Sequence, residues 1–181
     1  MINAQIPILG FAAHSGTGKT TLLTKLIPLL RNANIRLGLI KHSHHNFEID
    51  KPEKDSYRLR KSGASPVMLV SSHRRAIITE FDTITEPRLD IQLKAFDQSE
   101  LNLILVEGFK AEHFPKIELY RPSLNKPLLF PNDPTVIALA TDDSRHPTLS
   151  AHNCPVPMLL DINNPHAIAS FILHEFLGLA T

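Results

Sequence analysis

The sequence predicts an α/β protein with a mostly parallel sheet that helices cover on both faces. Segments with strand character alternate along the 181-residue chain with segments of helical periodicity, which is the pattern of such folds. Two of the strand segments, 103–106 and 136–140, are continuous apolar runs, as expected for strands buried on both faces. We expect residues 1–181 to form a single domain, because a chain of this length supplies one sizeable core.

The first expected elements are a strand at 6–13 and a helix from Thr20, in which leucine and isoleucine recur at helical spacing. Pro28 falls inside this pattern, so we expect the helix to kink or end near it. Residues 116–120 alternate between apolar and charged side chains, which is typical of a half-buried strand. The other expected strands are 37–40, 66–70, 76–79, 101–106, 136–140 and 158–160. The other expected helices are 55–62, 89–96 and 165–177, and 121–134 is expected to be a loop.

The turn between the first strand and the first helix has the pattern of a phosphate-binding P-loop. Gly16 and Gly18 allow backbone N–H groups to face phosphate oxygens where a Cβ atom would collide. Lys19 supplies charge to the β- and γ-phosphates, and the Thr20 hydroxyl is placed to bind Mg²⁺. Ala13 replaces the usual first glycine, which predicts slight strain if its φ is positive. The residues expected to bind the nucleotide are Ser15, Gly16, Thr17, Gly18, Lys19, Thr20 and Thr21.

An acidic residue, Glu107, ends the apolar run 103–106. Ligands of parallel α/β sheets bind at the carboxyl ends of the strands, so Glu107 is expected beside the nucleotide. Its carboxylate can belong to the Mg²⁺ shell or orient an attacking water, and Glu107 and Lys19 are the catalytic candidates. A salt-bridged carboxylate at a strand end is the alternative interpretation.

A basic, histidine-rich segment follows the expected strand 37–40. His42, His44 and His45 lie within four residues, which suggests a metal-binding loop. A surface loop explains the same residues. In a third interpretation the segment reaches the γ-phosphate side of the site, and Asp50 joins the Mg²⁺ shell.

Asp142 follows the expected strand 136–140. P-loop GTPases commonly place an aspartate in such a position, where its carboxylate accepts hydrogen bonds from the N1–H and N2–H groups of guanine. The lysine of a full Asn-Lys-x-Asp motif is missing, and a strand-end turn capped by an aspartate explains the same residue. Both interpretations remain open at this point.

Composition excludes several classes of protein. The formal net charge of +1, from 19 basic and 18 acidic residues, argues against a general nucleic-acid binder. No apolar run approaches the ~18–20 residues of a membrane-spanning helix. The lone Cys154 and an N-terminus without the pattern of a signal peptide predict a cytoplasmic location.

Taken together, these segments resemble the MobB family, the GTP-binding adapter proteins of molybdopterin-guanine dinucleotide biosynthesis. Many families share the P-loop, whereas the combination of 38–45 with 106–110 is far more specific. The segments that carry the resemblance are 11–23, 38–45, 50–52, 54–57, 59–64 and 103–110.

The resemblance implies a homodimeric GTP-binding protein with weak GTPase activity. It would act beside the guanylyltransferase (MobA) that joins GMP to molybdopterin, and it would bring GTP or the pterin to that enzyme. Two functions of other classes compete with this one. A small-molecule kinase would use Asp50, Asp55 or Glu107 as its base. A GTP-dependent metallochaperone would bind its metal through the three histidines.

Overall fold

The computed structural model describes residues 1–43, 47–150 and 157–180, and the chain forms two compact units. One unit combines Met1–His42 with Arg88–Thr181, and the other is Ser43–Pro87. Each unit has its own sheet. The single domain expected over residues 1–181 stays a prediction.

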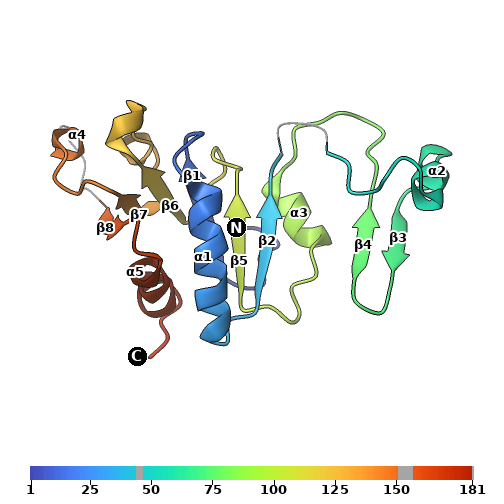
Figure 1. Ribbon diagram of the computed structural model, residues 1–181, viewed down its shortest axis with the longest axis horizontal. Coiled ribbons are helices and arrows are strands. Elements are labelled where there is room, and N and C mark those ends of the chain that lie inside the picture. The colour runs from blue at the N-terminus through green and yellow to red at the C-terminus, as the bar shows by residue number, and fades with distance from the viewer. Residues whose placement is uncertain (44–46, 151–156, 181) are drawn as a thin grey trace. The chain divides into compact units, whose positions relative to one another are not determined.

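The larger unit is built on a parallel sheet that has six strands within the described residues. The strands are arranged in the order β2-β5-β1-β6-β7-β8, so the first strand lies in the interior of the sheet (Figure 1). Their bounds are β1 (Ile8–Ala13), β2 (Leu37–Lys41), β5 (Leu103–Glu107), β6 (Lys116–Tyr120), β7 (Val136–Thr141) and β8 (Met158–Asp161).

Helices cover both faces of this sheet, which confirms the predicted fold class. α1 (Lys19–Asn32) and α5 (Pro165–Ser170) share an apolar core with β1, β5 and β6 on one face. α3 (Leu89–Ala95) packs on the opposite face against side chains of β1 and β5. The shorter elements are α4 (Pro147–Ser150), two 3₁₀ turns at Pro122–Leu124 and Phe130–Asn132, and a π-helical continuation of α5 at Phe171–Phe176.

Helix α1 presents a leucine stripe to the sheet, with Leu26 and Leu30 fully buried. The helix does not end at Pro28 but continues to Asn32. Pro28 lies on the exposed side, where water can hydrogen-bond the backbone carbonyl of Thr24 that the proline leaves without a donor. Neither α1 nor any other helix in the described part of the chain is long and apolar enough to cross a membrane.

Strand β6 lies between β1 and β7, and all five of its residues are buried. The prediction of a half-buried strand is therefore wrong, because its charged side chains are paired inside the protein. Lys116 Nζ donates to the Glu112 carbonyl at 2.6 Å, to Thr135 Oγ1 at 2.6 Å and to the Asp133 carboxylate at 3.0 Å. The carboxylate of Glu118 accepts hydrogen bonds from two backbone N–H groups of the loop that covers this face.

The smaller unit contains the helix α2 (Asp55–Lys61) and a hairpin of two antiparallel strands, β3 (Val67–Val70) and β4 (Arg75–Ile78). α2 ends before Gly63, which has a φ of 106° and stops the helix as the sequence predicts. Arg60 is buried and pairs with Glu48 and Glu80, which ties α2 to the segments on either side of it. One face of the hairpin exposes Met68 and Ile77, which lie opposite each other in the register.

Candidate functional site

The P-loop connects the end of β1 to the start of α1, as its pattern predicts. Gly16 and Gly18 have φ angles of 83° and 96°, the left-handed conformation that glycine adopts without strain. Ala13 is the last residue of β1 and does not have a positive φ, so the strain considered for this position does not arise. Within the loop, the hydroxyl of Thr17 donates to the backbone carbonyl of His14 at 2.8 Å.

Glu107 lies beside the P-loop between two lysines. Its Oε1 atom is 3.3 Å from Nζ of Lys19, and its Oε2 atom is 3.4 Å from Nζ of Lys41. The register explains this arrangement, because Glu107 pairs with Phe11 of β1 on one side and with Lys41 of β2 on the other. The structure thus brings together the two residues that were expected to be catalytic, while their catalytic role stays a prediction. In this arrangement Glu107 is also the salt-bridged strand-end carboxylate of the alternative interpretation.

The residues after β2 and β5 contact each other closely. The backbone N–H of His42 donates to the Glu107 carbonyl at 2.8 Å, and the His42 ring stacks on Phe109 with 4.8 Å between the centroids. Gly108 allows this contact, because a Cβ atom in its place would lie 2.6 Å from Cβ of His42. His42 therefore helps to hold Glu107 in place.

Two of the three histidines considered for metal binding, His44 and His45, lie outside the described residues. Within the described part of the chain, no group of three or more histidine, cysteine, aspartate or glutamate side chains is arranged to bind a metal ion. The metal-binding interpretation of this loop stays a prediction.

Lys110 is a basic residue of this region to which the sequence reasoning gave no role. Burial and the charge of Lys19 lower the pKa of Lys110. Burial is the larger of these two causes. Lys19 and Lys41 both contact Glu107, so positive charge is concentrated beside the P-loop, where it favours an anionic ligand.

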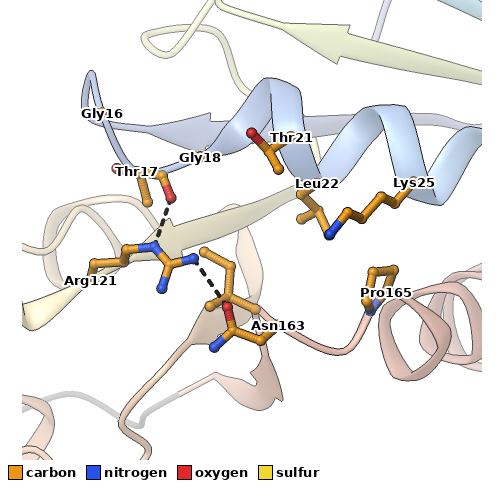
Figure 2. A pocket seen from close by; sticks show the side chains of 10 residues that line it. Gly16, Thr17, Gly18, Thr21, Leu22, Lys25, Arg121, Asn163 and Pro165 are labelled. Carbon is orange, nitrogen blue, oxygen red and sulfur yellow. Dashed lines mark hydrogen bonds between the residues drawn. The ribbon is translucent and has the colours of Figure 1, made fainter.

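A pocket of about 350 Å³ lies on the side of the P-loop formed by the ends of β6 and β8 (Figure 2). Arg121, which directly follows β6, lines this pocket together with Asn163, which follows β8. Thr21, one of the expected nucleotide-binding residues, lines it from α1. Ser15 and Thr20 are exposed at the P-loop.

Arg121 connects the P-loop with two strand ends. Its Nε–H donates to the backbone carbonyl of Thr17 at 3.0 Å, and one terminal nitrogen donates to Asn163 Oδ1 at 3.2 Å (Figure 2). The other terminal nitrogen lies 2.6 Å from Oδ2 of Asp142. Asp142 therefore lies next to the pocket in an ion pair. The turn after β7 is instead capped by Asp143, whose carboxylate accepts the backbone N–H of Arg145.

Asp50, the remaining metal-ligand candidate, belongs to the smaller unit. Its Oδ1 accepts a hydrogen bond from the Ser56 hydroxyl at 3.0 Å, and its buried Oδ2 has no partner among the described residues. A buried carboxylate oxygen of this kind suits a cation or a water molecule. The role of Asp50 in an Mg²⁺ shell stays a prediction.

Arg121 and Asn163 were missed in the sequence, although the rule that located Glu107 applies to them. Arg121 directly follows the buried parallel strand β6, and Asn163 comes two residues after the parallel strand β8, at the edge where ligands of such sheets bind. Neither belongs to a recognisable motif, and strand order decides which strand ends lie beside the P-loop.

Comparisons with known proteins identify the family of this chain. The model of the MobB family, described as molybdopterin guanine dinucleotide synthesis protein B, matches residues 8–142. The chain belongs to the MobB family. This confirms the resemblance seen in the sequence.

Two relatives of the MobB family are similar over nearly their full length, and both are named molybdopterin-guanine dinucleotide biosynthesis adapter protein. The one from Haemophilus influenzae is 46% identical, with 98% of this chain and 95% of the relative covered. The one from Escherichia coli strain K12 is 48% identical, with 93% of each chain covered.

Solved MobB structures share the fold. A crystal structure of molybdopterin-guanine biosynthesis protein B has a TM-score of 0.68 and 24% identity, with 93% of this chain and 99% of that chain covered. The structure of Bacillus subtilis MobB has the same TM-score and 18% identity, with coverage of 94% and 97%. At these identities the likeness concerns the fold alone.

Proposed function

We propose that this protein is a GTP-binding adapter in the biosynthesis of molybdopterin guanine dinucleotide. The observation that carries the proposal is the P-loop with its Lys19–Glu107 pair, at 3.3 Å, in a chain of the MobB family. The similarity to two adapter proteins extends over nearly the whole chain, which favours this function over a small-molecule kinase or a metallochaperone.

The charges around the P-loop support binding of a triphosphate. When phosphates enter the loop, the backbone N–H groups of Gly16 and Gly18 and the ammonium group of Lys19 bind their oxygens. Lys19 then leaves Glu107, whose carboxylate keeps its contact with Lys41. After the nucleotide binds, the Glu107 carboxylate contacts Lys41 but no longer Lys19. It is then available to bind Mg²⁺ or to orient a water molecule.

The donor set also fits Mg²⁺. The Thr20 hydroxyl and the Glu107 carboxylate offer the oxygen ligands that Mg²⁺ prefers. When bound, Mg²⁺ would neutralise charge on the β- and γ-phosphates. Glu107 would orient an attacking water through its carboxylate, which gives the weak GTPase activity that we propose.

The exposed hairpin face supports a homodimer. Met68, Val70 and Ile77 are each more than half exposed, and they lie on the same face of β3 and β4. Apolar side chains grouped in this way favour contact with another protein surface. We assign this face to a second copy of the chain. The dimer would then bind the guanylyltransferase, which acts on molybdopterin. We propose that this takes place in the cytoplasm.

The proposal is tested by co-purification with the guanylyltransferase in the presence and absence of GTP, using wild type and Lys19→Ala. We expect GTP to change the amount of guanylyltransferase retained by the wild type but not by the variant. Equal retention under all four conditions would show that nucleotide binding is not linked to the adapter role. A phosphorylated small molecule among the products, in place of GDP and inorganic phosphate, would favour the kinase.

A further inference from the structure

We infer that the pocket beside the P-loop reads guanine through Asn163 and Asp142, and that Arg121 holds these two side chains in the arrangement that guanine requires. The inference rests on the proposed function, because it takes the triphosphate of GTP to lie on the P-loop. It assigns a base-binding role to Asn163 and a positioning role to Arg121.

The pocket has the location and size for a nucleoside. One end is formed by Gly16 to Gly18, where the phosphates would lie, and the other end by Asn163 and Pro165 (Figure 2). Its volume of about 350 Å³ falls within the roughly 300–1,000 Å³ of small-molecule sites. Leu22 and Ile162 line it as well and offer apolar contact to a base.

The amide of Asn163 has a fixed orientation. A guanidinium group has only donors, so the side chain of Asn163 must present its oxygen to Arg121, which it does at 3.2 Å. The NH₂ group is then held on the side away from Arg121, and it can act only as a donor. The loop around it is also held, because the backbone N–H of Asn163 donates to the Asp161 carboxylate at 2.8 Å.

Asp142 supplies a hydrogen-bond acceptor, whereas Asn163 supplies a donor. Asp142 forms an ion pair with Arg121, at 2.6 Å, and a carboxylate in an ion pair can only accept hydrogen bonds. Only Oδ2 contacts Arg121, and each carboxylate oxygen has more than one lone pair. Asp142 therefore retains the capacity to accept further hydrogen bonds beside the pocket.

A donor and an acceptor held by the same guanidinium match the edge of guanine. Guanine presents the acceptor O6 next to the donors N1–H and N2–H. Adenine presents the donor N6–H and the acceptor N1 at the same positions. Its donor would face the NH₂ donor of Asn163, and its acceptor would face the carboxylate acceptor of Asp142. The pair Asn163 and Asp142 thus discriminates the two purines without the lysine of the usual guanine motif.

Arg121 also links this pair to the phosphate end of the pocket. Its Nε–H donates to the carbonyl of Thr17 in the P-loop at 3.0 Å. The same side chain therefore fixes the distance between the phosphate-binding loop and the two base-reading residues. This is why we assign a positioning role to Arg121 rather than a catalytic one.

The decisive variant is Asn163→Asp, with affinities for GTP, ITP and ATP measured by calorimetry. Aspartate has the shape of asparagine and keeps an oxygen for Arg121, but it has no NH₂ donor. We expect the ratio of GTP to ATP affinity to fall by ~10-fold or more, because a donor to O6 becomes an acceptor. ITP should follow GTP, since it carries the same O6. A purely structural role of Asn163 would leave the ratio unchanged, and that result overturns the inference.

A second comparison separates this inference from the proposed function. If the wild type binds GTP and Lys19→Ala does not, the P-loop binds the triphosphate. In that case an unchanged ratio of GTP to ATP affinity in Asn163→Asp overturns only the base-reading role. If the wild type binds neither nucleotide, the proposed function fails and the inference fails with it. Arg121→Lys should also lower the GTP to ATP ratio, because an ammonium group cannot hold Asn163, Asp142 and Thr17 together.

Discussion

Lys19 of the P-loop and Glu107 at the end of β5 form an ion pair, with 3.3 Å between Nζ and Oε1. The two residues are far apart in the sequence, and the parallel pairing of β1 with β5 brings them together. The ion pair holds the ammonium group of Lys19 next to the P-loop, where we propose that the phosphates bind. Nucleotide binding must exchange this carboxylate for phosphate oxygens, and several measurable effects follow from the exchange.

Removal of the lysine should weaken nucleotide binding strongly. Lys19→Ala takes away the charge-assisted contact to the phosphates, and we expect GTP affinity to fall by ~10-fold or more in calorimetry. The matched control is Lys94→Ala, which removes an exposed lysine of α3 on the opposite face of the sheet. Equal affinities of Lys19→Ala and the control would contradict the P-loop assignment.

Replacement of the carboxylate should separate binding from hydrolysis. Glu107→Gln keeps the size of the side chain but removes the charge that holds Lys19 and Lys41. We expect GTP affinity to stay the same or to rise, because Lys19 no longer has to leave an ion pair, while kcat falls by ~10-fold or more. Single-turnover hydrolysis and calorimetry on the same sample measure the two effects. A parallel loss of affinity would show that Glu107 only maintains the structure of the site.

Asp142 should control the choice of base. Asp142→Asn keeps an oxygen for Arg121 and replaces the carboxylate acceptor by a donor. We expect weaker GTP binding and stronger binding of XTP, whose O2 atom accepts a hydrogen bond where guanine has its N2–H donors. Competition of unlabelled GTP, XTP and ATP against a fluorescent GTP analogue measures this change. Identical selectivity in the variant and the wild type would place the base elsewhere.

Local patterns in the sequence predict much of this protein. The strand, P-loop and helix from β1 to α1 are contiguous, so their spacing alone predicts this strand–loop–helix arrangement. Glu107 could be placed as well, because an acid at the end of an apolar run lies at the carboxyl edge of a parallel sheet. Both predictions depend on residues close together in the chain.

Features that depend on strand order could not be predicted. Lys116 and Glu118 alternate with apolar residues and suggest an exposed face, but β6 is an interior strand covered by the loop that follows it. Arg121 and Asn163 come from the ends of β6 and β8, and only the folded sheet places both beside the P-loop. The guanidinium contacts that join Thr17, Asp142 and Asn163 have no signature in the sequence.

The buried carboxyl of Glu118 should make stability depend on pH. Burial raises the pKa of Glu118 to about 7, from an ordinary value of 4.5, although hydrogen bonds from the backbone N–H groups of Leu129 and Phe130 lower it. The folded protein thus retains this proton to a higher pH than the unfolded chain does. The stabilising contribution is complete below about pH 4.5 and is lost as the pH rises through about 7.

We therefore expect Glu118 to lower the free energy of unfolding by about 2–3 kcal/mol between pH 5 and pH 8. Urea unfolding of the wild type and Glu118→Gln, measured across this range, isolates the effect, because the histidines and other titrating groups are common to both proteins. Glutamine keeps a carbonyl oxygen for one of the two backbone N–H groups but does not titrate. As the pH rises, the free energy of unfolding of the wild type should fall relative to that of Glu118→Gln. A constant difference would mean that Glu118 ionises in the folded protein at the same pH as in the unfolded chain.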